Sequence, residues 1–386
     1  MVKSKTIINA LIFLQFFTCS YFLTSLTWAL EINAREAIVM DFETRTILYS
    51  KNSDQLMPPA SMSKIMTLYM LFNKIKQGSL SLKDTFVVSE NAWRKGGPAS
   101  GSSTMFLTPG ERVTVENLIR GIVVQSGNDA CIVVAEGIAG SEEAFSDSMT
   151  RDARELGLTN TTFRNSTGWP HSEHLSTAHD LGLLAISIIR DFPEFYHYFG
   201  EREFTYNNIR QYNRNPLLSS YYGSDGLKTG HTTDAGYGLT ASAERAGQRL
   251  VVVVNGLQNK KERKAEPSRL LDWGFREYKN YKLFDAGDEV EKAPVWLGKK
   301  PFVSLIIKDD VVITIPRRHR KGMKVSVKYK GPIPTPVAKG KVIGSLLIDL
   351  PEKKSIELPL VAGSDVIRLG AIGRIKETIR YLLWGN

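Results

Sequence analysis

The chain has 386 residues, of which 42% are hydrophobic and 10% aromatic, and it carries a formal net charge of +10. This length indicates two domains and a substantial core, and the composition excludes a disordered, collagen-like or multi-span membrane protein. Only two cysteines are present, which excludes a disulfide scaffold and a cysteine-rich metal site.

The N-terminal segment has the pattern of a secretory signal. Lys3 and Lys5 precede an uncharged apolar run over residues 6–30, and the small residue Ala29 offers a cleavage point. We therefore expect residues 1–29 to be a signal peptide, with an uncleaved membrane anchor as the alternative because the run is long. Export in turn leaves Cys131 as the single cysteine, which we expect to be a buried thiol in an apolar helix.

Residues 30–280 are predicted to form a domain of mixed helices and strands, of α/β or α+β class. Apolar periodicity and turn residues predict two strands, a helix, an interrupted helical region, a second helix, an antiparallel hairpin and a closing helix. In chain order these are 36–42 and 47–50, 61–76, 115–138 with a break near 125–128, 178–190, 237–243 with 250–254, and 268–278.

The sequence pattern changes at residue 281, and residues 281–363 are predicted to form a small all-β sandwich. Short β-rich runs are separated by Gly, Pro and charged residues, at 303–307, 311–315, 325–329, 342–348 and 355–360. The basic run Arg317–Lys321 lies between two of them, and we interpret it as a solvated loop in preference to a binding patch.

Residues 364–386 are predicted to form an amphipathic helix. On a helical projection Leu369, Ile372 and Ile379 share one face, whereas Arg374 and Arg380 lie on the other. A segment this short and charged should lie on a bilayer and not cross it. The alternative is a helix packed against its own domain.

The positive charge is concentrated in this C-terminal third. Residues 281–386 hold 20 Lys and Arg against 11 Asp and Glu, whereas residues 30–280 have a net charge of −1. Because an exported protein rarely meets nucleic acid, we interpret the basicity as suited to an anionic envelope surface and expect no nucleic-acid partner.

Ser61 and Lys64 are the first candidate catalytic residues. Their spacing of three places both side chains on one face of a helix. A serine hydroxyl needs a neighbouring base to become a nucleophile, and a lysine whose pKa is lowered by burial can be that base. On its own the pair is common, and a capped helix with a solvated lysine is then the favoured interpretation.

Two further motifs strengthen this interpretation. Ser126-Gly127-Asn128 interrupts a helical run. Lys228-Thr229-Gly230 is expected to precede an edge strand, where it offers a cation and a hydroxyl for a carboxylate. Ser126 lies 65 residues after Ser61, and Lys228 lies 102 residues after Ser126. Ser-x-x-Lys, Ser-x-Asn and Lys-Thr-Gly in this order form the joint motif of serine β-lactamases and penicillin-binding proteins.

The chain resembles the low-molecular-mass penicillin-binding proteins that act as serine-type D-alanyl-D-alanine carboxypeptidases. The resemblance covers the segments 59–67, 126–130, 213–215 and 225–232, the β-rich domain and the amphipathic tail. It implies a penicillin-binding or β-lactamase-like catalytic domain, peptidoglycan stem pentapeptides ending in D-Ala-D-Ala as substrate, and β-lactams as covalent inhibitors. It also implies a place on the periplasmic face of the inner membrane, and neither a metal nor a cofactor.

The resemblance further implies a role for each motif residue. Ser61 would form the acyl-enzyme, Lys64 would be the base, and Ser126 would pass a proton to the leaving D-Ala. The remaining residues would bind substrate. Asn128 would orient Lys64 and the substrate, and backbone N–H groups of Ser61 and His231 would form an oxyanion hole. The terminal carboxylate would be held by Lys228, Thr229 and Arg214, and Gly230 would allow its close approach to the backbone. Trp169 and His171 receive no role.

Two other functions remain open. A serine β-lactamase is disfavoured, because class A enzymes usually have Asp at the position of Gly127 and carry a Glu-x-x-Leu-Asn loop that this sequence lacks. A non-enzymatic envelope scaffold is disfavoured by the intact motifs.

Overall fold

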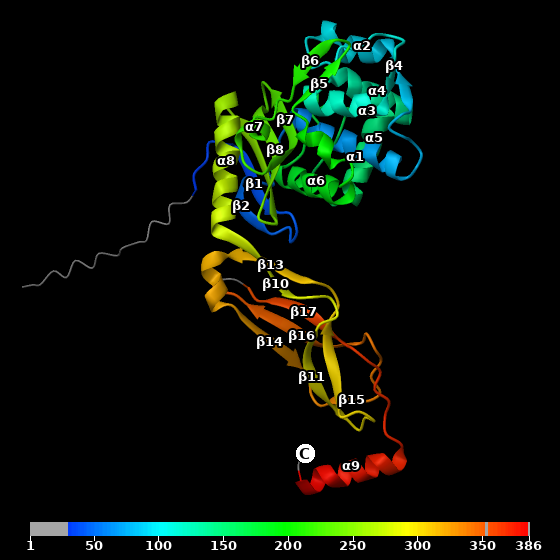
Figure 1. Cartoon of the computed structure of the whole chain (residues 1–386), viewed down its shortest axis with the longest axis vertical. Coiled ribbons are helices and arrows are strands. Elements are labelled where there is room, and N and C mark those ends of the chain that lie inside the picture. The colour runs from blue at the N-terminus through cyan, green and yellow to red at the C-terminus, as the bar shows by residue number, and fades with distance from the viewer. Residues whose placement is uncertain (1–29, 352–353, 385–386) are drawn as a thin grey trace, which may run out of the picture. The chain divides into compact units, whose positions relative to one another are not determined.

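The computed structural model describes residues 30–351 and 354–384. The predicted signal peptide lies outside the described residues. Figure 1 shows an N-terminal part built of helices around a sheet, a C-terminal part built of strands, and a terminal helix.

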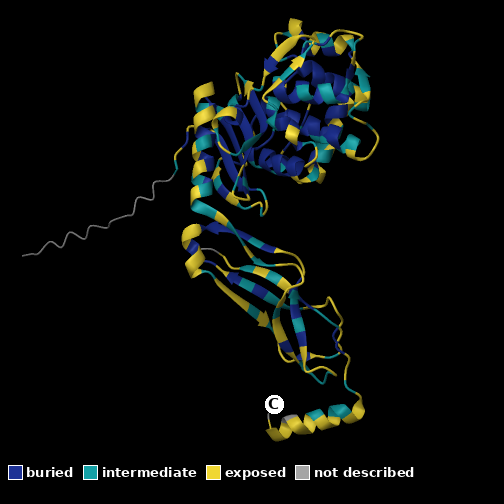
Figure 2. Ribbon diagram, viewed as in Figure 1, coloured by how far each residue is buried: buried dark blue, intermediate teal, exposed yellow. Residues whose placement is uncertain are grey.

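The N-terminal part is built on a five-stranded antiparallel sheet in the order β2-β1-β9-β8-β7. Its strands are β1 (Glu36–Asp41), β2 (Ile47–Lys51), β7 (Ser224–Thr232), β8 (Gly236–Arg245) and β9 (Gln248–Leu257). All six residues of β1 are buried, as expected for a strand covered on both faces (Figure 2). The predicted N-terminal strands and the predicted hairpin are therefore confirmed.

Helices cover this sheet. The longer ones are α1 (Lys64–Lys76), α4 (Asn128–Ala139), α5 (Glu142–Glu155), α6 (Ala178–Asp191) and α8 (Lys260–Glu277). Shorter segments are η1 (Ala60–Ser63), α2 (Glu90–Gly96), η2 (Pro98–Ser100), α3 (Val115–Arg120), η3 (Gly121–Gln125), η4 (Tyr196–Gly200) and α7 (Leu217–Ser220). Two small hairpins pair β3 (Thr85–Val87) with β4 (Arg112–Thr114) and β5 (Glu203–Tyr206) with β6 (Ile209–Tyr212).

Local capping explains where two of these helices begin. The Ser141 hydroxyl accepts a hydrogen bond from the Ala144 N–H at the start of α5, and Thr177 does the same for Asp180 at the start of α6. The predicted helix over 178–190 is confirmed as α6, whereas no helix was predicted for α5.

Two predictions for this part were wrong in detail. The closing helix was predicted to begin at residue 268, but α8 begins at Lys260 and includes Pro267 in its first half. The Lys-Thr-Gly motif was predicted to precede an edge strand, but it lies within β7, which is itself the edge strand.

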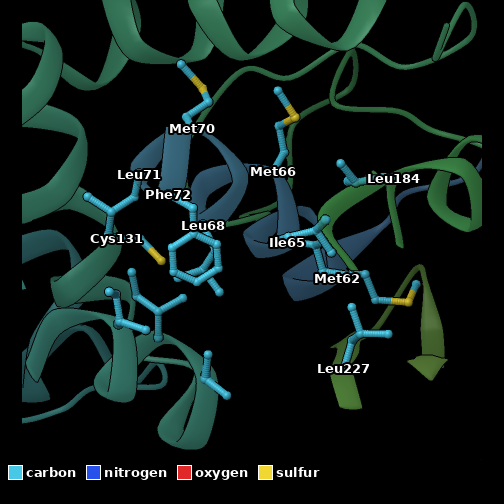
Figure 3. Close-up of a cluster of buried hydrophobic side chains, with 14 of the residues drawn as sticks. Met62, Ile65, Met66, Leu68, Met70, Leu71, Phe72, Cys131, Leu184 and Leu227 are labelled. Carbon is cyan, nitrogen blue, oxygen red and sulfur yellow. The ribbon is translucent and has the colours of Figure 1, made fainter. Parts of the chain in front are cut away.

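The hydrophobic core of the N-terminal part surrounds α1. Met62, Ile65 and Leu68 are fully buried, and Figure 3 shows them among side chains from other elements, including Leu184 of α6 and Leu227 of β7. Cys131 lies in the same cluster, so the prediction of a buried thiol is confirmed, and burial raises the pKa of this thiol to about 12. Core packing on all sides of α1 fixes the helix that follows Ser61.

The C-terminal part consists of strands, as predicted. A six-stranded sheet has the order β14-β16-β17-β12-β11-β15, and β10 pairs with β13. The strands are β10 (Tyr278–Phe284), β11 (Glu289–Trp296), β12 (Phe302–Ile307), β13 (Val311–Pro316), β14 (Lys324–Tyr329), β15 (Ile333–Pro334), β16 (Val342–Asp349) and β17 (Ile356–Ala362). The basic run lies in the 3-10 helix η5 (Arg317–Gly322) between β13 and β14.

The chain ends in helix α9 (Ala371–Trp384), which falls within the predicted amphipathic segment. Its apolar residues are exposed: Ile372 is 86% and Leu382 76% accessible. Among residues 30–351 and 354–384, no helix is both long enough and apolar enough to cross a bilayer.

Candidate active site

Ser61 lies in η1, in the turn that leads into α1, and Lys64 is the first residue of α1. The Lys64 ammonium donates a hydrogen bond to the Ser61 hydroxyl at 3.1 Å. The predicted pairing of a serine hydroxyl with a lysine amine is thus present at hydrogen-bond distance.

The environment of Lys64 favours its neutral form. Its side chain is fully buried, and burial, with a further contribution from Arg214, lowers the pKa of Lys64 to about 8. Lys64 also donates to Asn128 Oδ1 at 2.7 Å and to the Thr167 carbonyl at 2.5 Å. These acceptors fix the amine beside Ser61, and the lowered pKa makes an unprotonated amine accessible near neutral pH.

Ser126 and Asn128 lie at the predicted break between helical segments. Ser126 ends η3 in the left-handed conformation with φ of 64°, and α4 begins at Asn128. This reversal of the backbone places both residues at the wall of one cavity, which Ser61 also lines.

The Lys-Thr-Gly segment reaches the same cavity from the edge strand β7. Thr229, Gly230 and His231 line it, whereas Lys228 is buried and donates to the Thr229 carbonyl at 3.3 Å. Burial, with Lys64 and Arg214 nearby, lowers the pKa of Lys228 well below its ordinary value. A side chain at Gly230 would lie 2.9 Å from the Pro59 carbonyl, so β7 packs this closely against η1 only with glycine at that position.

The cavity has a volume of about 590 Å³, and two arginines give one of its walls a positive charge. Arg214 donates to the Ser103 hydroxyl at 2.5 Å and was predicted to bind a carboxylate. Arg263 of α8 was not predicted to lie here. Its guanidinium stacks over Tyr237, and its buried Nε has no hydrogen-bond partner in the structure.

The segment 161–177 closes the cavity on another side. The Ser166 carbonyl accepts from Thr67 at 2.6 Å, and Gly168, with φ of 79°, packs so closely on Ala60 that a side chain there would overlap its carbonyl. Trp169, which received no role from the sequence, is half-exposed at the rim of this cavity.

His174 ties this segment to the serine–lysine turn. Its Nδ1 accepts from the Arg164 N–H at 3.1 Å, so the neutral ring carries its proton on Nε2, which lies 2.8 Å from the Ser63 hydroxyl. Burial lowers the pKa of His174 to about 3. The imidazole is therefore a neutral donor that holds Ser63, the residue before the catalytic lysine candidate.

Asp129 similarly holds a loop in place, at the opposite wall of the catalytic cavity. Its buried carboxylate accepts hydrogen bonds from the Thr104 hydroxyl at 2.5 Å and from the backbone N–H groups of Met105 and Leu107 at 3.0 and 3.2 Å. This loop follows Ser103, which contacts Arg214. The sequence offered no pattern for this role beyond the position of Asp129 next to the Ser-x-Asn motif.

Comparisons with known proteins agree with this geometry. Residues 24–259 match the family model described as D-alanyl-D-alanine carboxypeptidase, and residues 278–368 match the C-terminal domain of penicillin-binding protein 5. The chain is 40% identical over 351 residues to the D-alanyl-D-alanine carboxypeptidase DacC of Escherichia coli, covering 90% of this chain and 88% of that protein. It is 35% identical over 351 residues to DacF of Bacillus subtilis, covering 90% and 89%.

Solved structures give the same result. Penicillin-binding protein 5 from Haemophilus influenzae superposes with a TM-score of 0.82 at 37% identity, over 88% of this chain and 98% of that one. The chain therefore belongs to the D-alanyl-D-alanine carboxypeptidase family and is a serine hydrolase of that family with the penicillin-binding protein 5 type of C-terminal domain.

Proposed function

We propose that the chain removes the terminal D-alanine from peptidoglycan stem pentapeptides through an acyl-enzyme on Ser61. The observation that carries this proposal is the buried Lys64 amine, with a pKa lowered to about 8, at 3.1 Å from the Ser61 hydroxyl. A nucleophile with an adjacent base is the arrangement that acyl transfer needs.

In the proposed reaction, the Ser61 oxygen attacks the carbonyl carbon of the penultimate D-Ala while neutral Lys64 takes its proton. Backbone N–H groups of Ser61 and His231 stabilise the oxyanion. The C–N bond then breaks, and Ser126 passes a proton to the amine of the leaving D-Ala. Water finally hydrolyses the ester, which releases the shortened peptide and restores Ser61.

The positive wall accounts for the preference for a C-terminal carboxylate. Arg214 and Arg263 carry charge into the cavity, and Thr229 supplies a hydroxyl on the adjacent strand. Because a guanidinium can donate two parallel hydrogen bonds, it binds a free carboxylate better than a peptide bond. This favours removal of the last residue over internal cleavage.

β-Lactams should acylate the same serine. Their strained amide presents a carbonyl and a carboxylate to the groups that bind the substrate. The sequence lacks the Glu-x-x-Leu-Asn loop that speeds deacylation in class A β-lactamases, so the adduct should persist. We therefore propose covalent inhibition in preference to rapid β-lactam hydrolysis.

We further propose that the protein works on the periplasmic face of the inner membrane, in cell-wall maturation and control of cell shape. The signal-like pattern of residues 1–29 and the exposed apolar side chains of α9 support this location. In α9, exposed Ile372, Ile375 and Leu382 suit the acyl region, while Arg374 and Arg380 suit anionic headgroups.

The direct test is D-Ala release from a stem pentapeptide by the purified protein and by Ser61→Ala. The wild type should release one D-Ala per peptide, and Ser61→Ala should lose at least about 10³-fold in kcat. A Ser61→Ala variant with undiminished release would refute the proposed mechanism.

A further inference from the structure

The basic run of the C-terminal part is anchored to its domain and holds its cations at the surface. Within η5, His319 is buried, and Gly322 packs so closely on Pro351 that a side chain there would lie 2.6 Å from the proline Cγ. The other long side chains of η5 are exposed, and we call them the basic patch: Arg317, Arg318, Arg320 and Lys321. A folded segment, and not a loose loop, therefore presents these charges to solvent.

The charges of the basic patch are not compensated within the protein. Among residues 30–351 and 354–384, none of its side chains forms an ion pair. Arg317 donates to a backbone carbonyl at 3.2 Å and Arg320 lies 5.2 Å over the Tyr281 ring, contacts that orient both side chains without neutralising them. By contrast, the exposed Arg164 pairs with Glu173 at 3.0 Å. Neighbouring like charges repel one another, and an anionic partner would relieve that repulsion.

The position of the basic patch disfavours a lipid headgroup as this partner. Directly after η5, Lys324 of β14 pairs with Asp349 of β16, and next to it Ile348 pairs with Ile356, the first residue of β17. Helix α9 follows from the other end of β17, at Ala362. Strand β17 spans about 20 Å, at roughly 3.3 Å per residue. Headgroup charges that bind α9 are screened over such a distance, since the Debye length is about 8 Å at physiological ionic strength.

We propose that the basic patch binds peptidoglycan through the carboxylates of its stem peptides, separately from the catalytic cavity. The inference rests on the proposed function, because it takes as partner the polymer whose stems the enzyme would trim. A stem ends in a D-alanine carboxylate before and after trimming, so the polymer presents this group repeatedly. Guanidinium groups bind carboxylates through paired hydrogen bonds, and several weak contacts to one polymer add up.

This contact would keep the enzyme on its polymeric substrate between turnovers. The sequence alone favoured a solvated loop over a binding patch at this run. The uncompensated charges on an anchored helix are the observation that favours the patch.

The test is sedimentation of the full-length mature protein, in detergent, with purified lipid-free sacculi. All proteins carry Ser61→Ala, so that the polymer is not trimmed during the measurement. Added replacement of Arg318, Arg320 and Lys321 by Gln should raise the Kd for sacculi roughly tenfold, about twofold for each exposed charge contact. Amidation of the sacculus carboxylates should weaken binding of the parent protein to the level of this triple variant.

The matched control replaces Lys308, Lys339 and Lys341 by Gln, which removes the same charge from other exposed positions of the C-terminal part. Its Kd should change less than about twofold. An equal loss in this control would mean that only net charge matters, and an unchanged Kd in the triple variant would mean that the basic patch makes no contact. A triple variant that loses binding to anionic vesicles but not to sacculi would identify lipid as the partner. Each of these results overturns the inference.

Two further measurements separate other causes. With Ser61 intact, the triple variant should release D-Ala from a soluble pentapeptide at the wild-type rate, which shows that its fold is retained. Independently of any variant, parent binding that stays constant between 50 and 500 mM NaCl would also overturn the inference, because exposed charge contacts weaken with salt. A wild type that binds sacculi but releases no D-Ala would refute the proposed function and leave the polymer contact standing.

Discussion

The Lys64 side chain combines two properties that oppose each other in water. A buried amine loses hydration and so loses affinity for its proton, yet three oxygen acceptors, from Ser61, Asn128 and Thr167, favour the protonated form. The balance leaves its pKa at about 8, which is more than two units below an exposed lysine. Near neutral pH the amine can thus exchange a proton with Ser61 in either direction.

This pKa predicts the pH dependence of activity. Acylation needs the neutral amine, so kcat/KM for D-Ala release should rise with pH, reach half its plateau at about pH 8 and level off above it. Lys64→Arg should abolish the activity, because a guanidinium stays protonated throughout this range. The measurement is a pH–rate profile from pH 5 to 10; a profile that is flat across pH 6–9 would contradict the role of Lys64 as base.

At the scale of elements, segment 161–177 determines the environment of the Ser-x-x-Lys turn. It contacts η1 and α1 through the Thr167 carbonyl on Lys64, the Ser166 carbonyl on Thr67, and His174 on Ser63. None of these contacts is local in sequence. The base is therefore oriented by a loop about 100 residues away, and this loop also lines the catalytic cavity.

The contact of His174 with Ser63 predicts a pH dependence of the free energy of unfolding. Its pKa of about 3 in the fold lies below the ordinary value near 6.5, so between these pH values the unfolded chain binds a proton that the folded chain does not. The free energy of unfolding should therefore fall as the pH drops from about 6.5 towards 3. The His174→Gln variant should lose the part of this pH dependence of the free energy of unfolding that comes from the binding of one proton.

The measurement is chemical denaturation of both proteins at several pH values between 3 and 8. His179→Gln is a suitable control, because His179 is a partly exposed histidine that pairs with Asp54 at the surface. Identical pH slopes for the wild type and His174→Gln would show that His174 does not remain neutral in the fold.

Apolar periodicity explains which helices and strands the sequence could predict. The segments that became α6, β8 and β9 have strong apolar periodicity, and their predictions are confirmed. Helix α8 begins with Lys-Lys-Glu-Arg-Lys, and Pro267 follows three residues later. This start lacks an apolar pattern, so the sequence predicted a helix that begins too late. Strand β7 was not recognised because Gly226 and Gly230 weaken the strand pattern.

The residues of the site likewise divide into those that the sequence predicted and those that it missed. Ser61, Ser126, Asn128, Arg214, Thr229, Gly230 and His231 were predicted from ordered motifs and resemblance, and all of them line one cavity. Arg263 and Asp129 were missed as functional candidates because no local motif marks them. An arginine in a charged helix and an aspartate at a helix start are both ordinary in sequence, and only the folded contacts distinguish them.

At the scale of the whole molecule, charge separates along the chain. The net charge is −1 over residues 30–280 and +9 over residues 281–386, so the chemistry and the basicity lie in different segments. Helix α9 adds exposed apolar side chains to this charge. We interpret the C-terminal third as the part that associates with an anionic surface and the N-terminal part as the part that performs hydrolysis.

This interpretation predicts that deletion of residues 364–386 separates attachment from activity. The full-length mature protein should sediment with vesicles of anionic phospholipid, whereas a chain ending at residue 363 should stay in solution. Its D-Ala release should match that of the full chain, since every candidate catalytic residue precedes this segment. Equal sedimentation of both chains would contradict the role of α9.

The contributions of charge and of apolar contact to vesicle binding by α9 can be measured separately. Replacement of Arg374, Lys376 and Arg380 by Gln keeps the apolar face, so binding should weaken mainly for anionic vesicles and little for neutral ones.

The central claim, that Ser61 is the residue acylated during catalysis, is tested most directly by mass spectrometry of the purified protein after exposure to benzylpenicillin. The account predicts one covalent adduct per chain, located on the peptide that contains Ser61, absent from Ser61→Ala and greatly slowed in Lys64→Arg. An adduct on another residue, or rapid penicillin turnover without any adduct, would contradict it.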